Sequence, residues 1–404
     1  MAEVSEHRYR WVVLAAGTFA QASFSASSVG LPALGPALKS HFGLTLGETG
    51  VVLGAIGIGM LFTLLPWGLV ADRIDERWVI ATGLTGAAAL LAFASTVHSF
   101  GTVTGALIGV GALGASVNAA SGRAIMAWFP AAELGTALGI RQTAIPIGGA
   151  LGVLLPVLAS AGGTRLAFLF LSGMCAVGAA VAAAFIRGRA GGEPELGDVS
   201  RPLHDPRMWL LGTGTGLYLV AQIGITGFVV LFLHEHRHVS THAAAALFAT
   251  INVLAIVARI GSGRISDRLG SRLRPLRAIG VALTVFTAAV AAGTDAPLAL
   301  LAPLFVVAGV LSMAWNGLSY AAAAEMAGSA RTGAALGFQQ TLLGVSAACV
   351  PPAFAAIVGA SSWRVAFALA ALGPLLGVLA LRKVPEATSV ARRLETSAIP
   401  PAAR

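Results

Sequence analysis

Long apolar stretches dominate the chain, and short polar segments separate them. A helix needs about 20 mostly apolar residues to cross a bilayer. We therefore predict an all-α polytopic membrane protein with twelve transmembrane helices. The predicted spans are 11–34, 48–70, 78–97, 102–127, 135–159, 165–186, 208–233, 243–263, 278–293, 297–323, 333–358 and 364–381.

Three polar segments organise these spans into two halves. Residues 1–10 and 382–404 are polar tails, and 187–207 is a Gly- and Pro-containing segment that reads as a linker. The linker leaves six predicted spans on each side. We expect a six-helix bundle over 11–186 and a second over 208–381.

Composition excludes a soluble globular protein. Only 11% of the residues are charged, 56% are hydrophobic, and the mean hydropathy is +0.83, whereas soluble chains carry about 25% charge. The two cysteines lie in apolar runs and imply neither a disulfide framework nor a metal cluster. We expect no cofactor, no bound metal and no nucleic-acid partner, although the net charge of +9 would suit one.

The basic residues are placed by topology. With the N-terminus inside, nineteen Lys and Arg fall in predicted cytoplasmic segments, four outside and three within spans. This asymmetry follows the positive-inside rule. The excess of Arg over Lys suggests a GC-rich bacterial genome. We expect a monomer with many passes through the bacterial inner membrane and with both termini in the cytoplasm.

An internal repeat supports the division into halves. Residues 113–143 align without gaps to 311–341, and 11 of the 31 positions are identical. The identical polar pairs, which carry the argument, include Asn118/Asn316 and Gln142/Gln340. Duplicated halves place a binding site near the bilayer midplane, between the halves, and move against each other. The sequence thus predicts two pseudo-symmetric bundles.

A loop motif occurs once in each half. GLVADRIDER (68–77) follows the second predicted span, and GRISDRLGSR (263–272) follows the eighth. Both resemble the cytoplasmic G-x-x-x-D-R-x-G-[RK]-[RK] loop of the major facilitator superfamily. The first copy departs from the pattern, with Asp75 and Glu76 in place of the Gly and a basic residue.

The resemblance implies a transporter of that fold. In the family this loop cluster latches the cytoplasmic side in one conformation, so its residues are expected to gate rather than to touch substrate. The glycines are expected to let neighbouring helices approach closely, and the charged groups to form charge-assisted bonds. The gating set is Gly68, Asp72, Arg73, Arg77, Gly263, Asp267, Arg268 and Arg272.

Three arginines lie within spans: Arg123, Arg141 and Arg259. An arginine at the centre of a membrane helix costs roughly 2.5–3.5 kcal/mol, so these side chains should face the protein interior or a cavity. Snorkelling to the interface is the alternative and is strongest for Arg123. The run 257–263 also resembles the eighth span of monocarboxylate and oxalate/formate transporters, where the arginine pairs with a substrate carboxylate. The acidic residue often found one turn earlier is replaced here by Ala255.

No span centre holds a carboxylate or a histidine. A buried guanidinium with no buried acid favours a carboxylate or similar oxyanion as its partner. We therefore predict a secondary transporter for a small, carboxylate-like anion that works by alternating access. The predicted substrate-binding residues are Arg259, Arg141, Arg123, Asn118, Gln142, Asn316, Gln339 and Gln340, with Gln21, Tyr218, Gln222 and Asn252 as weaker candidates.

Other function classes gain less support. A drug or metabolite efflux pump of the same superfamily is the alternative, and unpaired arginines disfavour a cationic cargo. No catalytic grouping indicates an enzyme. Exchange, uniport and symport with a co-transported proton all stay open. The histidine-rich segment 234–242 is expected to be a solvated external loop rather than a metal site.

Overall fold

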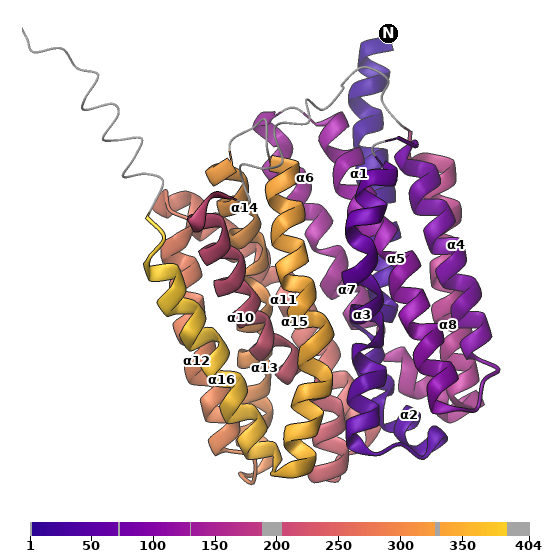
Figure 1. Ribbon diagram of the computed structural model, residues 1–404, viewed down its shortest axis with the longest axis vertical. Coiled ribbons are helices and arrows are strands. Elements are labelled where there is room, and N and C mark those ends of the chain that lie inside the picture. Colours follow the sequence, from indigo (N-terminus) through magenta and orange to yellow (C-terminus); the bar gives the residue numbers. More distant parts are fainter. Residues whose placement is uncertain (1, 72, 130, 188–203, 328–331, 386–404) are drawn as a thin grey trace, which may run out of the picture.

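The computed structural model describes residues 2–71, 73–129, 131–187, 204–327 and 332–385. Within these residues every regular element is a helix. Figure 1 shows the helices side by side, with the N-terminal half in indigo to magenta on one side and the C-terminal half in orange to yellow on the other.

The helices follow the predicted spans closely, and most ends agree within a few residues. The N-terminal half contains α1 (Ala2–Ser28), η1 (Leu31–Leu34), α2 (Gly35–Phe42), α3 (Leu46–Ala71), α4 (Glu76–Ala94), α5 (Phe100–Trp128), α6 (Ala131–Gln142), α7 (Ala144–Leu151) and α8 (Leu154–Phe185). The C-terminal half contains α10 (Pro206–Leu231), η2 (Phe232–His236), α11 (Thr241–Leu269), α12 (Leu273–Ala292), α13 (Leu298–Ala314), α14 (Asn316–Ala327), α15 (Thr332–Ala360) and α16 (Trp363–Arg382).

Eleven helices in the described part of the chain are long and apolar enough to cross a membrane. The span predicted over 135–159 is divided instead among α6, α7 and the first turns of α8. The chain then changes direction inside α8, where Gly163 has a φ of 68° that favours glycine. Twelve spans therefore remain a prediction, while an all-helical protein with many candidate spans is observed.

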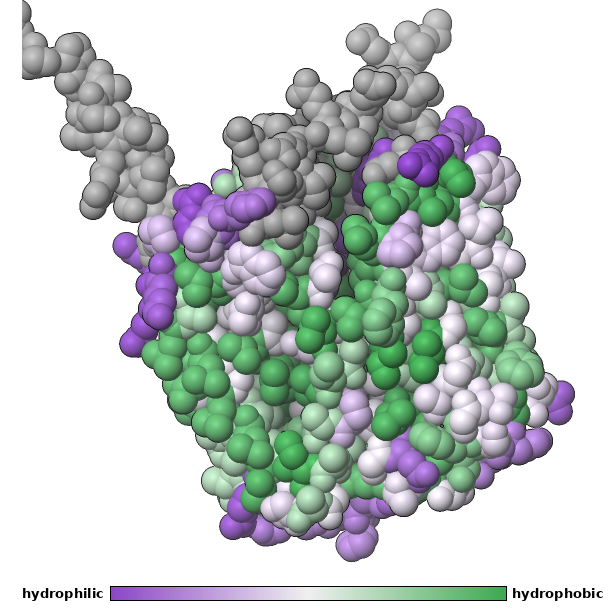
Figure 2. Space-filling model, in the orientation of Figure 1, coloured by the Kyte–Doolittle hydropathy of each residue, from purple (hydrophilic) through white to green (hydrophobic). Residues whose placement is uncertain are grey.

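The surface matches this assignment. Figure 2 shows hydrophobic residues across the middle of the face in view and hydrophilic residues gathered at its two ends. We call the end where α1 begins and α16 finishes the near end, and the end that carries α2 and η2 the far end (Figure 1). An apolar band between polar ends is the pattern expected of a protein that sits in a bilayer.

Small residues set the helix spacing in the N-terminal half. A Cβ on Gly59 of α3 would lie 1.9 Å from the Ile108 carbonyl oxygen, and one on Gly111 of α5 would lie 2.0 Å from the Ile56 carbonyl oxygen. Two backbones are thus in direct contact. Close approach of this kind maximises van der Waals packing where lipid offers no hydrophobic driving force.

The substitution Gly111→Leu is therefore expected to destabilise the protein. The clashing atom belongs to the backbone and cannot rotate away, so overpacking should cost about 1–3 kcal/mol or more. Thermal unfolding of the detergent-solubilised protein, followed by tryptophan fluorescence, measures this loss. Gly105→Leu on the same helix is the control, because no atom lies within 4 Å of its Cβ position. Equal melting temperatures for the two variants would contradict the expectation.

The two halves meet tightly toward the far end, along a contact we call the α3–α15 seam. Cβ atoms added to α3 would lie 2.4 Å from the Ala355 side chain at Gly50 and 2.6 Å from the Ala347 carbonyl oxygen at Gly57. An ion pair between Lys39 of α2 and Glu235 of η2 also joins the halves there. At this end the halves are in close backbone contact.

Candidate functional site

Arg141 and Arg259 lie at matching depths in opposite halves. Arg141 is ten residues from the start of α6, and Arg259 is ten residues from the end of α11, about 15 Å from the near end at 1.5 Å per residue. Their exposed fractions are 7% and 8%. Neither side chain turns outward to lipid, in agreement with the expectation for buried charge.

Arg141 is held by polar groups from two other helices, α1 and α5. Its Nε donates to Ser121 Oγ of α5 at 2.9 Å, and its Nη2 donates to Gln21 Oε1 of α1 at 3.3 Å. Nη2 also donates to the backbone carbonyl of Asn118 at 3.2 Å. The guanidinium is thus oriented by neutral acceptors, which stabilise its position without cancelling its charge.

Arg259 binds two carbonyl groups that helix breaks expose. Its Nη1 donates at 2.7 Å to the Gln142 carbonyl, where α6 ends before α7. Its Nε donates at 3.0 Å to the Met313 carbonyl, just before the break between α13 and α14. A helix end leaves carbonyls without intrahelical partners, and membrane proteins keep such breaks where they line a site. The Gln142 contact therefore links the two halves, and the Met313 contact ties Arg259 to the helix break of its own half.

Tyr320 lies near both arginines and was not among the predicted site residues. Its hydroxyl donates to Gln340 Oε1 at 2.9 Å, and Gln142 also hydrogen-bonds it. Both guanidinium charges act electrostatically on this phenol. The sequence offers only a weak signal for this residue. It is a phenol in an alanine-rich span, and it occupies the repeat position of Gly122.

The charge of this site is not balanced by the described residues. Neither Arg141 nor Arg259 forms an ion pair with any described carboxylate, and Arg259 Nη2 is buried without a hydrogen-bond partner. A buried donor on a charged group is costly to leave unsatisfied. The arrangement is suited to accept an anion.

The internal repeat reappears as equivalent contacts. Arg141 and Gln339 occupy the same repeat position, and so do Ser121 and Ser319. Arg141 donates to Ser121 in one half, and Gln339 donates to Ser319 in the other. The halves therefore share one scaffold, but only the N-terminal copy carries charge at this position.

The other predicted polar residues divide between the site and the packing. Asn118 contributes a backbone carbonyl, while Gln142 and Gln340 meet Tyr320 as described. Asn316 Nδ2 lies 3.5 Å from Gln222 Oε1, and Gln339 also contacts Thr215 at 3.4 Å.

Two of the weaker candidates have different surroundings. Tyr218 donates to the Leu276 carbonyl at 3.2 Å inside the C-terminal half. Asn252 Nδ2 donates to the Phe248 carbonyl at 2.9 Å, and its Oδ1 lies where a Cβ on Gly149 would fall. Tyr218 thus serves helix packing, and Asn252 faces the other half.

Arg123 is separated chemically from the other two arginines. Its Nε lies 3.1 Å from Glu76 Oε1, at the start of α4 toward the near end. The Glu76 carboxylate already pairs with this guanidinium, whereas the adjacent Gly122 lies beside the Arg141 guanidinium. The structure places Arg123 in an ion pair of the loop region, so we do not include it in the proposed site.

The second loop motif forms a compact ion-pair cluster. Arg272 bonds to Asp267 Oδ1 at 2.5 Å and to Glu325 Oε1 of α14 at 2.8 Å. Gly270 ends α11 with a φ of 57°, which explains the glycine of the motif. Arg268 is exposed beside it. These contacts join elements of the same half.

In the first motif the acidic and basic partners of the ion pair are exchanged relative to the second. Here an acid of the loop, Glu76, meets an arginine of the fourth span, Arg123, whereas in the second copy a loop arginine meets Glu325. Asp75 caps α4 by accepting from the Arg77 backbone N–H at 2.9 Å, and the Arg77 guanidinium lies 4.6 Å from the Trp78 ring. Arg73 is exposed, and Asp72 lies outside the described residues.

The role expected for Gly68 and Gly263 requires correction. A Cβ added to either residue meets no described atom within 4 Å. Close helix contact is found instead at Gly50 and Gly57, because the halves meet toward the far end rather than beside these near-end glycines.

The sequence model of the Major Facilitator Superfamily matches residues 14–343. The chain belongs to the major facilitator superfamily. An uncharacterized MFS-type transporter of Mycobacterium tuberculosis (strain CDC 1551 / Oshkosh) is 31% identical over 380 residues, which cover 91% of this chain and 84% of that protein. This major facilitator chain is thus a multi-pass membrane transporter, and the expectation that it is not an enzyme is confirmed by its relatives.

Other similarities are narrower. A probable sulfoacetate transporter of Cupriavidus necator is 31% identical over 154 residues, covering 35% of this chain and 34% of that protein. A bacterial homolog of the human lysosomal transporter Spinster, in an inward-facing and occupied conformation, has a TM-score of 0.76 at 16% identity and covers 98% of this chain and 99% of its own. The nucleoside transporter NupG (D323A mutant) has a TM-score of 0.72 at 16% identity, covering 92% and 99%. These two structures show the shared fold alone.

Proposed function

We propose that this major facilitator protein is a secondary transporter of a small organic anion. The observation that carries the proposal is the pair of buried guanidinium groups, Arg141 and Arg259, with no carboxylate partner among the described residues. An anion between the halves would accept from Arg259 Nη2, and it could accept from the Tyr320 hydroxyl only in exchange for the bond to Gln340. The other predicted polar residues would complete the binding site or support it from behind. They are Gln142, Gln340, Asn118, Asn316 and Gln339.

The chemistry of the site favours a carboxylate or sulfonate. A guanidinium presents a planar fork that matches such oxyanions, and burial strengthens the interaction. The partial similarity to a probable sulfoacetate transporter supports the same class. The resemblance of 257–263 to monocarboxylate and oxalate/formate transporters points in this direction too.

Alternating access is the mechanism that we propose for the fold. In the conformation described here the halves are packed together along the α3–α15 seam, so the far end is shut. Reopening it would require the halves to rock about Arg141 and Arg259, and the ion pairs of the two loop motifs would move with their own halves. Exchange, uniport and proton symport are all compatible with a site that lacks a buried acid.

The orientation follows from the distribution of basic residues. We propose that the near end, with both termini, faces the cytoplasm and that the far end faces outward across the bacterial inner membrane. In that orientation the described conformation is closed to the outside. We further propose that the protein acts as a monomer.

A melting-temperature screen with matched salts tests the anion class. We expect at least one of acetate, oxalate, sulfoacetate and phosphate to stabilise the purified protein relative to sodium chloride of equal ionic strength. Occupancy at a hundredfold excess over Kd adds about 2.7 kcal/mol. Stabilisation by tetraphenylphosphonium, with none by the anions, would contradict the proposal and support the efflux pump.

A further inference from the structure

The histidine-rich segment at the far end is solvent-exposed, yet one of its histidines contacts a second element of the structure. His236 ends η2, a π-helical turn that continues α10. Its ring packs on the buried Phe232, with centroids 5.3 Å apart, and its Nε2 lies 3.2 Å from Asp295 Oδ1.

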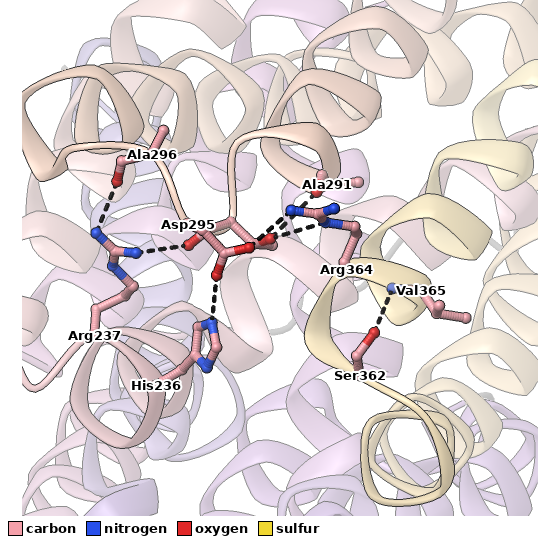
Figure 3. A network of polar contacts seen from close by, with 9 residues as sticks. His236, Arg237, Ala291, Asp295, Ala296, Ser362, Arg364 and Val365 are labelled. Atoms are coloured by element: carbon pink, nitrogen blue, oxygen red, sulfur yellow. Dashed lines mark hydrogen bonds and ion pairs between the residues drawn. The ribbon is translucent and has the colours of Figure 1, made fainter.

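Asp295 connects this turn to two more elements of the same half. Figure 3 shows its carboxylate between His236 and Arg364, and Arg364 Nη2 lies 2.7 Å from Asp295 Oδ2. Arg237 donates to the carbonyls of Thr294 and Ala296 on either side of it, at 3.1 Å and 2.7 Å. The loop between α12 and α13 is thereby tied to η2 and to the start of α16.

The neighbouring residue of the same turn reaches the other half. Glu235 pairs with Lys39 of α2, and the two side chains are 31% and 26% exposed. Next to this pair, a Cβ on Gly35 would lie 3.0 Å from the Leu231 side chain, so the end of α10 packs closely on α2. One short turn therefore holds a contact within its own half through His236 and a contact between the halves through Glu235.

We propose that His236 and Asp295 form an external proton-binding site that controls closure of the far end. Protonation of His236 turns its contact with Asp295 into an ion pair. The η2 turn is then anchored with Glu235 facing Lys39, and the closed far end is stabilised. This regulation does not depend on which substrate the protein carries. It rests on the proposed orientation, in which the far end faces outward.

The direction of the pH effect follows from the charges. Hydrogen bonding to His236, together with the Arg364 guanidinium, lowers the pKa of Asp295 from its ordinary value, so this carboxylate stays ionised under mildly acidic conditions. An imidazole ordinarily gains its proton between pH 8 and pH 5. A proton gained by the imidazole therefore adds a positive charge opposite a carboxylate that is already negative.

The charged groups around His236 come from four elements. They are Glu235 and Arg237 beside it, Asp295 of the α12–α13 loop, Arg364 of α16 and Lys39 of α2. Of these, Asp295 is in direct contact with the imidazole. The cationic neighbours bind the carboxylate or the backbone rather than the ring.

Distance measurement across the far end tests the proposal with the full-length protein. Spin labels are placed at Ser40→Cys in α2 and His242→Cys in α11, both exposed, in a Cys349→Ser background because Cys175 is buried. Pulsed electron double resonance should show the ratio of closed to open far ends rising about threefold from pH 8 to pH 5.5, since a hydrogen bond to a charged donor is stronger than a neutral one but is weakened by solvent exposure.

The variants separate a proton site from a general pH effect. His236→Gln should abolish the pH dependence, whereas His98→Gln, another exposed far-end histidine, should retain it. Glu235→Gln should open the far end at both pH values, and Lys39→Glu combined with Glu235→Lys should restore closure. A wild type insensitive to pH, or a His236→Gln protein with undiminished pH dependence, would overturn the proposal.

Discussion

Arg259→Gln is expected to abolish anion binding and uptake while leaving the protein folded. Glutamine keeps one donor for the Gln142 or Met313 carbonyl, but it removes the charge and the unpartnered Nη2. Losing one partner of a buried charge pair costs about 3–5 kcal/mol, which corresponds to at least a 100-fold loss of affinity, at about 1.4 kcal/mol per tenfold. Uptake into proteoliposomes of the anion that most stabilises the wild type measures this effect.

Two controls distinguish a site residue from a structural one. Arg264→Gln removes a charge from the same helix at an exposed position, and it should transport normally. Arg259→Lys retains the charge without the planar fork and should recover only part of the activity. Full uptake by monodisperse Arg259→Gln protein would remove this residue from the binding site and, with it, the main support for an anion.

Gly57→Leu is expected to stop transport by preventing closure of the far end. The Ala347 carbonyl oxygen lies 2.6 Å from the added Cβ and belongs to the backbone of the opposite half. A side chain at this position can be accommodated only if the halves separate along the α3–α15 seam. The variant should therefore fold but stay in states with the far end apart.

Spin labels at positions 40 and 242, as described above, measure that separation. Gly359→Leu on the partner helix is the control, since no atom lies within 4 Å of its Cβ position, and it should retain both closure and uptake. Wild-type distances and uptake in the Gly57→Leu protein would show that the seam does not limit closure.

The sequence anticipated the candidate spans well because their signal is local. An apolar stretch long enough to cross a bilayer is recognised directly from composition, and eleven such helices appear at the predicted spans within the described residues. The division of the span at 135–159 was not predicted. The division depends on the helix break at Thr143. The break leaves the Gln142 carbonyl free to accept from Arg259, and no local sequence pattern specifies that contact.

The candidate site was anticipated only in part. Burial of Arg141 and Arg259 follows from the cost of charge in lipid, but depth in a span did not reveal that Arg123 meets Glu76. Tyr320 was overlooked because a single hydroxyl among alanines carries no periodic signal. The histidine-rich segment is exposed, as expected of a solvated segment, but the contact of His236 with Asp295, 59 residues away, was not predicted.

By itself, the sequence determined that this protein belongs in a membrane, that its halves repeat one another and that unmatched positive charge lies within its spans. These properties depend on composition and on alignment, which need no knowledge of distant contacts. The tertiary structure alone decided which arginines lack an acidic partner, where the helices break and at which end the halves meet. Each of these depends on groups from separate helices coming within a few ångströms of one another, and that proximity is a property of packing.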